Sequence, residues 1–406
     1  MRIVQKYGGS SLKTLDLIQM VAERIHHAVQ DNGHELVVVV SAMGDTTDEL
    51  LEQAAAVDGA KSPENLDFLM MTGEMQSAAL MAMALTRLGT PARALTGAQA
   101  GIHTNEDYGQ ARIQHVDVSL VESLLAQKVT PVVTGFQGIS PNGFYTTLGR
   151  GGSDLTAIAL ASALKADSCE IYSDVAGVFT ADPRVVPQAQ ALSALSYDEM
   201  LELASQGAQV LQTQAVLYAR QSGVTVEARS TFEPKPGTRI ASVAAKDDHP
   251  VTAVALDTHI TKIGLVGVPD RPGVAALACE RLAAAGINID LVFQALSHEN
   301  QRADIALTVA DRDRDRAVAV CRDTLRELEG RDLVVDGDVA KVSAVGAGVR
   351  NHVGVAATMF RALADAGINI QMISTSEIKV SCIVARADAS RALNQVHDAF
   401  GLDSVN

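Results

Sequence analysis

The stretch that decides the fold is Thr146 to Asp154, which reads Thr-Thr-Leu-Gly-Arg-Gly-Gly-Ser-Asp. An apolar run typical of a strand, Val132–Phe136, precedes it, and an Ala- and Leu-rich run typical of a helix, Leu155–Leu164, follows it. Glycine is a poor former of helix and strand interiors, and three glycines surround one arginine here. The pattern favours a loop whose backbone approaches a ligand closely.

Polar side chains in this loop suggest what it would bind. We expect Ser153 and Asp154 at the N-cap of the following helix, so that free backbone N–H groups point out of the loop. Arg150 can bind a carboxylate through two hydrogen bonds, and Asp154 can accept from an amine or bind a metal. A tight turn followed by a capped helix would use the same residues. The loop alone leaves both interpretations open.

A second glycine pair lies near the N-terminus, in Ile3-Val4-Gln5-Lys6-Tyr7-Gly8-Gly9-Ser10-Ser11. It is not a Walker A loop, because Lys6 precedes the glycines instead of following them. Backbone N–H groups and a nearby lysine still suit phosphate oxygens. Together the two stretches resemble the amino acid kinase family, and aspartate kinases in particular. The resemblance extends over essentially all 406 residues.

Bulk composition limits the class of protein. Hydrophobic residues make up 47% of the chain and aromatic residues 3%, with no Trp, which is typical of an α/β protein. The net charge of −15 argues against nucleic acid or an anionic membrane as a partner. The four cysteines have no zinc-type spacing. Without a signal peptide or a run of 18 apolar residues, the expected location is cytoplasmic.

The order of elements predicts the catalytic fold. A helical stretch, Leu17–Val29, is followed by the apolar run Val37–Val40, and alternating strands and helices imply a parallel sheet with helices on its faces. Ligands bind such sheets at the carboxyl ends of the strands. The resemblance implies the amino acid kinase fold, a central, mostly parallel sheet sandwiched by helices, over residues 1–240.

The last part of the chain repeats itself. Ala285-Gly286-Ile287-Asn288-Ile289 returns 81 residues later as Ala366-Gly367-Ile368-Asn369-Ile370. Each copy shows a βαββαβ pattern, typical of a ferredoxin-like antiparallel sheet. The copies resemble paired ACT domains, expected at 262–336 and 337–406 after a linker and shared strand at 241–261. The resemblance also implies that Val251–Leu256 pairs with the second ACT sheet.

The resemblance implies transfer of phosphate from Mg²⁺-bound ATP to the β-carboxylate of L-aspartate, giving 4-phospho-L-aspartate. No metal site made by the protein alone is expected. The residues expected near the transferred phosphate are Lys6, Gly8, Gly9, Ser10 and Asp154. Those expected to bind aspartate are Ser41, Thr72, Glu74, Arg150, Gly151, Gly152 and Ser153. Those expected to bind the nucleotide are Ser173, Asp174, Phe179, Asp182, Arg184 and Gln209.

Individual roles follow the family as well. Glu74, expected at the start of a long helix, would bind the aspartate ammonium group with Asp154, although a carboxylate there can also be a simple helix-dipole partner. Arg150 would bind the α-carboxylate. Backbone amides of Gly8 to Ser10 would surround the phosphoryl group that Lys6 neutralises.

Several positions depart from the family pattern. Tyr108 and Gln110 replace the usual His and Lys or Asn in a polar loop, Ala176 replaces an Asp, Phe179 replaces the commoner Tyr, and Gln209 replaces a Lys near the phosphates. Two alternatives therefore stay open: a kinase for another amino acid or carboxylate, and a weakly active, ACT-based regulatory subunit. A longer partner chain is also compatible with the sequence.

The ACT pair implies feedback regulation by lysine or threonine. It also implies a homodimer, or a larger assembly built on it, joined through exposed sheet edges. The residues expected to bind the effector are Asp270, Val274, Ala275, Asn288, Ile289, Asp290, Gln294, Asn369, Ile370, Thr375, Ser376 and Glu377.

Overall fold

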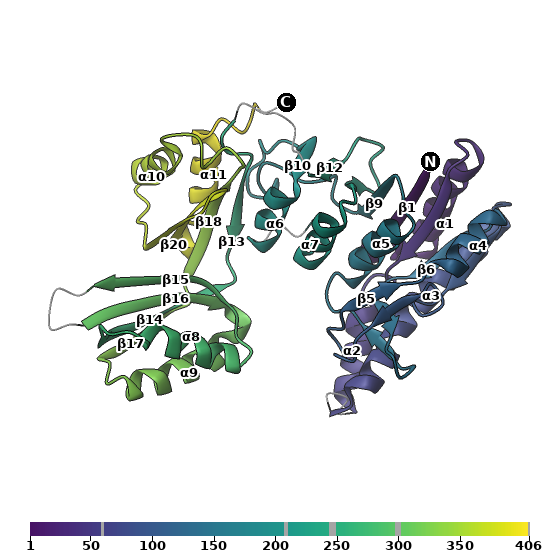
Figure 1. Cartoon of the computed structure of the whole chain (residues 1–406). Coiled ribbons are helices and arrows are strands. Elements are labelled where there is room, and N and C mark those ends of the chain that lie inside the picture. The colour runs from purple at the N-terminus through teal and green to yellow at the C-terminus, as the bar shows by residue number, and fades with distance from the viewer. Residues whose placement is uncertain (58–60, 207–209, 243–248, 297–301, 405–406) are drawn as a thin grey trace. The chain divides into compact units, whose positions relative to one another are not determined.

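The computed structural model describes residues 1–57, 61–206, 210–242, 249–296 and 302–404 (Figure 1). These residues form two compact units. The first unit consists of Met1–Val178 and Ala191–Lys246, and the second of Phe179–Gln190 and Asp247–Val405. Each unit is described by itself below.

The first unit is built on an eight-stranded sheet with the order β10-β12-β11-β9-β1-β2-β6-β3. Every adjacent pair in it is parallel except β11 with β12, as expected for alternating strands and helices. The strands are β1 (Arg2–Tyr7), β2 (Glu35–Val40), β3 (Ala92–Leu95), β6 (Thr130–Thr134), β9 (Ser168–Ser173), β10 (Ala194–Ser196), β11 (Val226–Ser230) and β12 (Thr238–Ala241).

Helices cover this sheet. They are α1 (Leu15–Gln30), α2 (Thr46–Ala56), α3 (Pro63–Arg87), α4 (Ser119–Ala126), α5 (Gly152–Ala163), α6 (Tyr197–Ser205) and α7 (Thr213–Ser222). One core cluster joins α1 and α3 to strand residues such as Val38, Val40 and Val132. The alternate residues Val37 and Val39 are also fully buried, and α5 packs against β1, β2 and β9. The sheet is therefore covered on both faces, which explains its continuous apolar strands.

A smaller four-stranded sheet, β5-β4-β7-β8, lies in the same unit. Its strands are β4 (Ile102–Thr104), β5 (Ile113–Val116), β7 (Gln137–Ile139) and β8 (Tyr145–Thr147). β7 and β8 form a hairpin between the end of β6 and the Gly-rich loop. This hairpin delivers the loop to the beginning of α5.

Two helix starts differ from the sequence-based expectation. α3 begins at Pro63, not near Leu69, so Glu74 lies in the middle of the helix and the dipole interpretation of Glu74 is wrong. Proline at the first turn is a favourable start because its missing N–H is not needed there. α5 begins at Gly152 with Gly151 as its N-cap, so the expected N-cap position of Ser153 and Asp154 is also wrong. Gly151 has φ 73°, a left-handed conformation that glycine adopts easily.

The second unit contains two four-stranded antiparallel sheets, β15-β16-β14-β17 and β13-β18-β20-β19. Its strands are β13 (Ala253–Asp257), β14 (Ile260–Pro269), β15 (Ile289–Leu296), β16 (Arg302–Ala310), β17 (Asp332–Asp336), β18 (Val339–Val345), β19 (Met372–Thr375) and β20 (Lys379–Ala385). Its helices are α8 (Val274–Ala284), α9 (Arg314–Glu327), α10 (Val355–Asp365) and α11 (Ala389–Ala399). The predicted βαββαβ order is confirmed in the first copy, whereas the second copy has no strand after α11 among the described residues and takes its fourth strand from β13.

The two copies interleave through β13. This strand precedes the first copy in sequence but pairs antiparallel with β18 of the second, from Ala253 with Val345 to Asp257 with Lys341. It occupies the sheet position that β17 has in the first copy. The predicted pairing of the Val251–Leu256 run with the second ACT sheet is therefore confirmed.

The segment Phe179–Gln190 clusters with the second unit, although the expected domain division leaves it inside residues 1–240. Ala181 and Val186 pack into the core of the second ACT copy, beside residues of α10 and α11. The amide of Val254 donates to the carbonyl of Thr180 at 2.7 Å. Apolar packing thus places this short segment in the second unit, and the chain passes from one unit to the other at both ends of the segment.

By length and composition alone, α3 is apolar enough to cross a membrane, but half of the relevant window is buried inside the protein. Its residues Ala78, Met81 and Leu85 belong to the core cluster that covers the sheet. These observations identify α3 as a core helix. The four cysteines are free thiols.

Candidate functional site

The carboxyl ends of the neighbouring strands β1, β2 and β9 lie side by side, and residues just beyond them form the candidate site. This row of strand ends is called the edge of the large sheet below. β1 lies between the other two strands and is parallel to both, with Tyr7 beside Val40 and Tyr172. The amide of Ser41 donates to the carbonyl of Tyr7, and the amide of Gly8 donates to the carbonyl of Tyr172, both at 3.1 Å. The predicted residues Gly8 and Ser41 are therefore held together here. Because the Gly8 amide is used within the fold, the amides of Gly9 and Ser10 remain the candidates for phosphate.

Lys6 and Asp154 form the central ion pair of this edge. Lys6 Nζ lies 2.6 Å from Asp154 Oδ1, and their side chains are only 12% and 8% exposed. The contact lacks the angles of a hydrogen bond, so it is an ion pair rather than an aligned bond. Lys6 comes from β1 and Asp154 from the first turn of α5, where the helix N-terminus favours negative charge. The two Gly-rich motifs, about 140 residues apart in the chain, thus meet in one site.

Glu74 enters the site from α3. Its side chain is buried, and Oε1 accepts a hydrogen bond from the amide of Ala42 at 3.2 Å, just beyond β2. Its other oxygen, Oε2, is buried and has no hydrogen-bond partner among the residues that the structure describes. Burial raises the pKa of Glu74 to about 7, while the hydrogen bond from Ala42 acts in the opposite direction. A buried carboxylate with a free oxygen is suited to a cationic ligand.

Thr134 is a polar residue of this region that sequence analysis missed. It ends β6 directly beside Val40 of β2, and it shares a sheet face with Val132 because strand side chains alternate. That face is the one covered by α3, the helix of Glu74. Thr134 is 1% exposed and its hydroxyl has no partner within the described part of the chain. A hydroxyl at the end of an apolar strand was the only signal in the sequence.

The Gly-rich loop is closely packed, and this explains its glycines. Gly149 and Gly151 both have left-handed φ angles. A Cβ on Gly151 would lie 1.9 Å from the side chain of Gln212, and one on Gly152 would lie 2.9 Å from both Leu148 and Phe136. Arg150, between them, is exposed and has no hydrogen-bond or ion-pair partner among the residues that the structure describes. Its guanidinium is available to a ligand.

Other predicted residues lie at or near the same edge. Ser10 Oγ donates to Asp174 Oδ1 at 3.2 Å, which joins the β1 and β9 ends. Ser153 is buried in α5 against Gly135, and Ser173 ends β9. Thr72 points to the exposed side of α3, where its hydroxyl donates to the carbonyl of Leu69 at 2.7 Å.

The predicted nucleotide residues divide between the two units. Ser173 and Asp174 belong to the first, whereas Phe179, Asp182 and Arg184 belong to the segment in the second. Arg184 Nη2 lies 2.7 Å from Asp182 Oδ2, and its hydrogen bonds lower the pKa of that carboxyl. Gln209 lies outside the described residues.

Most of the residues predicted to bind an effector are exposed on the ACT copies, at the loops before α8 and around β15 and β19. Two of them have ion-pair partners. Asp290 of β15 contacts Lys341 of β18, with Oδ2 2.5 Å from Nζ. Glu377 contacts Arg350 at 2.6 Å, which ties the segment after β19 to the loop before α10.

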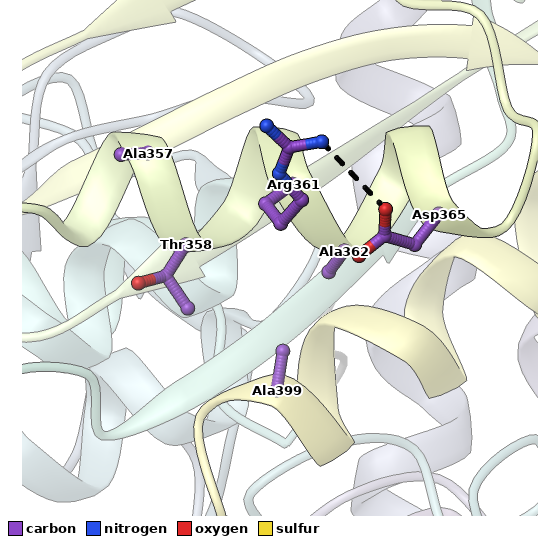
Figure 2. A pocket seen from close by; sticks show the side chains of 6 residues that line it. All are labelled: Ala357, Thr358, Arg361, Ala362, Asp365 and Ala399. Atoms are coloured by element: carbon purple, nitrogen blue, oxygen red, sulfur yellow. Dashed lines mark ion pairs between the residues drawn. The ribbon is translucent and has the colours of Figure 1, made fainter.

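A shallow hollow lies on the helical side of the second ACT copy (Figure 2). Small side chains of α10 and the end of α11 line it, and an Arg361–Asp365 ion pair of 3.8 Å lies along its rim. None of the predicted effector residues lines this hollow.

Comparison with protein families agrees with the two units. The sequence model of the amino acid kinase family matches residues 1–228, and the ACT domain model matches residues 263–325 and 342–400. These matches confirm the predicted α/β fold class with paired ACT domains.

Known relatives narrow the family. The chain is 45% identical over 404 residues to an aspartokinase of Thermus thermophilus, covering 99% of both chains. It is 25% identical to Escherichia coli aspartokinase III in complex with aspartate and ADP, with a TM-score of 0.79, covering 98% of this chain and 99% of the other. The complex of the same enzyme with lysine and aspartate gives 25% and 0.75 with the same coverage. This chain therefore belongs to the aspartokinases, the amino acid kinases with ACT domains that phosphorylate aspartate.

Proposed function

We propose that the sheet edge formed by Lys6, Glu74, Arg150 and Asp154 is the place where this chain transfers phosphate from ATP to L-aspartate. The observation that carries the proposal is the convergence of Lys6 and Asp154, two buried charges from the two Gly-rich motifs, in one ion pair. Glu74 adds a buried carboxylate oxygen that has no partner in the described part of the chain. The relative from E. coli, which binds aspartate and ADP, supports this assignment.

In the proposed reaction, an oxygen of the aspartate β-carboxylate attacks the γ-phosphorus of ATP. A carboxylate–phosphorus O–P bond forms, the bond from the γ-phosphorus to the β,γ-bridging oxygen breaks, and ADP leaves with that electron pair. No general base is required, because the attacking carboxylate is already ionised at neutral pH. Catalysis rests on positioning and on charge neutralisation by Lys6. Asp154 holds the ammonium group of Lys6 in this position through their ion pair.

The two ends of the aspartate backbone would be held by opposite charges. Arg150, exposed and unpaired among the described residues, binds the α-carboxylate through two hydrogen bonds. Glu74 Oε2 and Asp154 accept from the ammonium group. Thr134 Oγ1, which is buried at the same sheet edge, offers a further acceptor. Glu74 Oε2 and Thr134 Oγ1, which are buried without a partner among the described residues, would each gain one in this arrangement.

The nucleotide would extend over the ends of β1 and β9, near Ser10, Ser173 and Asp174. Mg²⁺ prefers to keep phosphates and water in its coordination shell, with one or two carboxylates from the protein. Asp174 is the exposed carboxylate in the right place for this role. The ion would neutralise charge on the phosphates.

The ACT pair would supply regulation. We infer that lysine or threonine binds around Asp270, Asn288 and Gln294 of the first copy and around Asn369 and Ser374–Glu377 of the second, and that this favours a less active state. The lysine complex of the E. coli relative supports the kind of ligand. Exposed sheet edges at β15 and β19 favour a homodimer through the ACT copies. A cytoplasmic location fits a biosynthetic enzyme of this family.

Substitution of Arg150 tests the proposal. A point charge cannot replace a two-bond guanidinium contact. Arg150→Lys should therefore raise the KM for aspartate at least about tenfold, which corresponds to the loss of one charge-assisted hydrogen bond. The KM for ATP should change little. Steady-state assays of ADP release, with each substrate varied in turn, measure both constants. Equal effects on the two substrates would place Arg150 outside the aspartate site.

A further inference from the structure

Asp67 is a buried carboxylate that none of the roles above includes. It lies in the second turn of α3 and is 2% exposed. Its Oδ2 accepts from the amide of Thr147 at 2.7 Å and from the amide of Gly109 at 3.0 Å, and its Oδ1 accepts from the hydroxyl of Thr147 at 2.8 Å. Three donors from two distant parts of the chain therefore converge on one side chain. Hydrogen bonds to a carboxylate are roughly twice as strong as those between neutral groups.

The two segments held by Asp67 both border the proposed aspartate site. Thr147 ends β8 and lies three residues before Arg150. Gly109 lies between Tyr108 and Gln110, in the loop that departs from the family pattern. The two segments also touch each other, since a Cβ on Gly149 would lie 3.2 Å from the carbonyl of Gly109. Asp67 thus ties the start of the Gly-rich loop and its neighbouring loop to α3.

The same helix carries Glu74, seven residues further along. Residues seven apart lie on the same side of an α-helix, about two turns or 10.5 Å along its axis. Asp67 and Glu74 are both buried on that side of α3. Helix α3 therefore carries Glu74, the proposed contact for the ammonium group. Through Asp67 it also holds the loop of Arg150, the proposed contact for the carboxylate.

We propose that Asp67 is a positioning residue that fixes the separation between Glu74 and Arg150, and through it the fit of the substrate's ammonium and carboxylate groups. The proposal rests on the proposed function. It assigns Asp67 no contact with substrate. Its side chain acts through Thr147 and Gly109, and the ATP side of the site does not depend on it.

Asp67→Asn is the direct test. The amide is the same size but uncharged: its oxygen can still accept from the two backbone amides and its NH₂ group can donate to the hydroxyl of Thr147, so all three bonds lose their charge assistance and weaken. We expect the KM for aspartate to rise about tenfold to a hundredfold, as misplacement of a binding group by about 1 Å can cause. The KM for ATP should stay within about twofold, because Lys6 and the β1 and β9 ends are not anchored by Asp67.

Two further variants separate positioning from stability. Thr147→Val removes only the hydroxyl bond to Asp67 and should raise the KM for aspartate by a smaller factor. Thr104→Val is the matched control, because it breaks a buried hydroxyl bond of 2.6 Å to Thr146, the adjacent residue of β8, without touching Asp67. The control should keep the wild-type KM for aspartate. Thermal unfolding of all three variants shows whether a change in KM follows a change in Tm.

The outcomes are distinct. A selective rise in the aspartate KM of Asp67→Asn and Thr147→Val, absent from Thr104→Val, supports the positioning role. Normal KM values with a lowered Tm, or equal losses for both substrates, would overturn it and leave Asp67 as a structural carboxylate. If Asp67→Asn does not fold, Thr147→Val with its control gives the same decision. Failure of the proposed function would appear earlier, as absence of aspartate-dependent ADP release in the wild type.

Discussion

At the scale of single residues, the main feature of the site is a set of charged side chains that the fold buries. Lys6 and Asp154 neutralise each other at 2.6 Å, so each of these two buried charges has an ionic partner. Glu74 has no such cationic partner among the described residues, and burial raises its pKa to about 7. The ammonium group of a bound substrate would supply this cationic partner. The site is therefore poised for a ligand that carries both a positive and a negative group.

Glu74 predicts a pH dependence of aspartate use. A raised pKa means that the carboxyl is protonated below about pH 7 and ionised above it. Only the ionised form attracts ammonium, so kcat/KM for aspartate should fall as the pH drops below about 7, by up to about tenfold per pH unit. Glu74→Gln should lower kcat/KM at high pH and remove this part of the profile. A wild-type profile that stays flat from pH 6 to 8, or one that Glu74→Gln leaves unchanged, would contradict the role of Glu74.

At the scale of elements, the two ACT sheets are joined by a buried lysine. The Lys341 side chain is 1% exposed in the middle of β18, and its ammonium contacts Asp290 of β15 in the other copy. Thr308 also donates to Asp290, at 3.4 Å. Apolar residues of both copies, including Ile260, Leu291 and Met372, surround this region. The pair therefore links the two copies inside the second unit.

Removal of Asp290 should destabilise the second unit. Asp290→Ala leaves the Lys341 ammonium buried without its partner, which should cost about 3 kcal/mol of unfolding free energy in urea denaturation of the full chain. The double variant Asp290→Ala/Lys341→Met should recover most of the loss, because the uncompensated charge is gone. Asp323→Ala is the control, since its partner Arg326 is exposed and the expected loss is below about 1 kcal/mol. A single variant as stable as this control would show that Lys341 finds water or another acceptor.

The elements also show what the sequence could predict. Local patterns sufficed for the strand–helix–strand–strand–helix order that both repeats share, where Gly286 and Gly367 end α8 and α10 with the same φ of 68°. They also sufficed for the two Gly-rich loops. The sequence did not predict that Glu74 lies in the middle of its helix, because α3 already begins at Pro63. Asp67 was invisible because its partners lie 42 and 80 residues away, and only the folded chain brings them together.

At the scale of the whole molecule, the chain forms two units and passes from one to the other more than once along its sequence. Phe179–Gln190 leaves the kinase unit, packs into the second ACT copy and returns. It follows β9, which carries Ser173 at its end, and it contains Asp182 and Arg184. The sequence of this segment is part of a motif of the kinase family, but its side chains pack in the second unit, which contains the ACT copies. Its packing depends on contacts with α10 and α11, which no local pattern around Asp182 contains.

The central claim is that the edge of the large sheet phosphorylates L-aspartate, and ADP release by the purified full chain tests it most directly. The assay would supply Mg²⁺-ATP with L-aspartate or another amino acid, and hydroxylamine would trap the acyl phosphate. The account predicts ADP release that depends on L-aspartate, with an equal amount of aspartyl hydroxamate, and loss of both in Lys6→Ala. ADP release without hydroxamate, a different preferred amino acid, or undiminished activity in Lys6→Ala would contradict it.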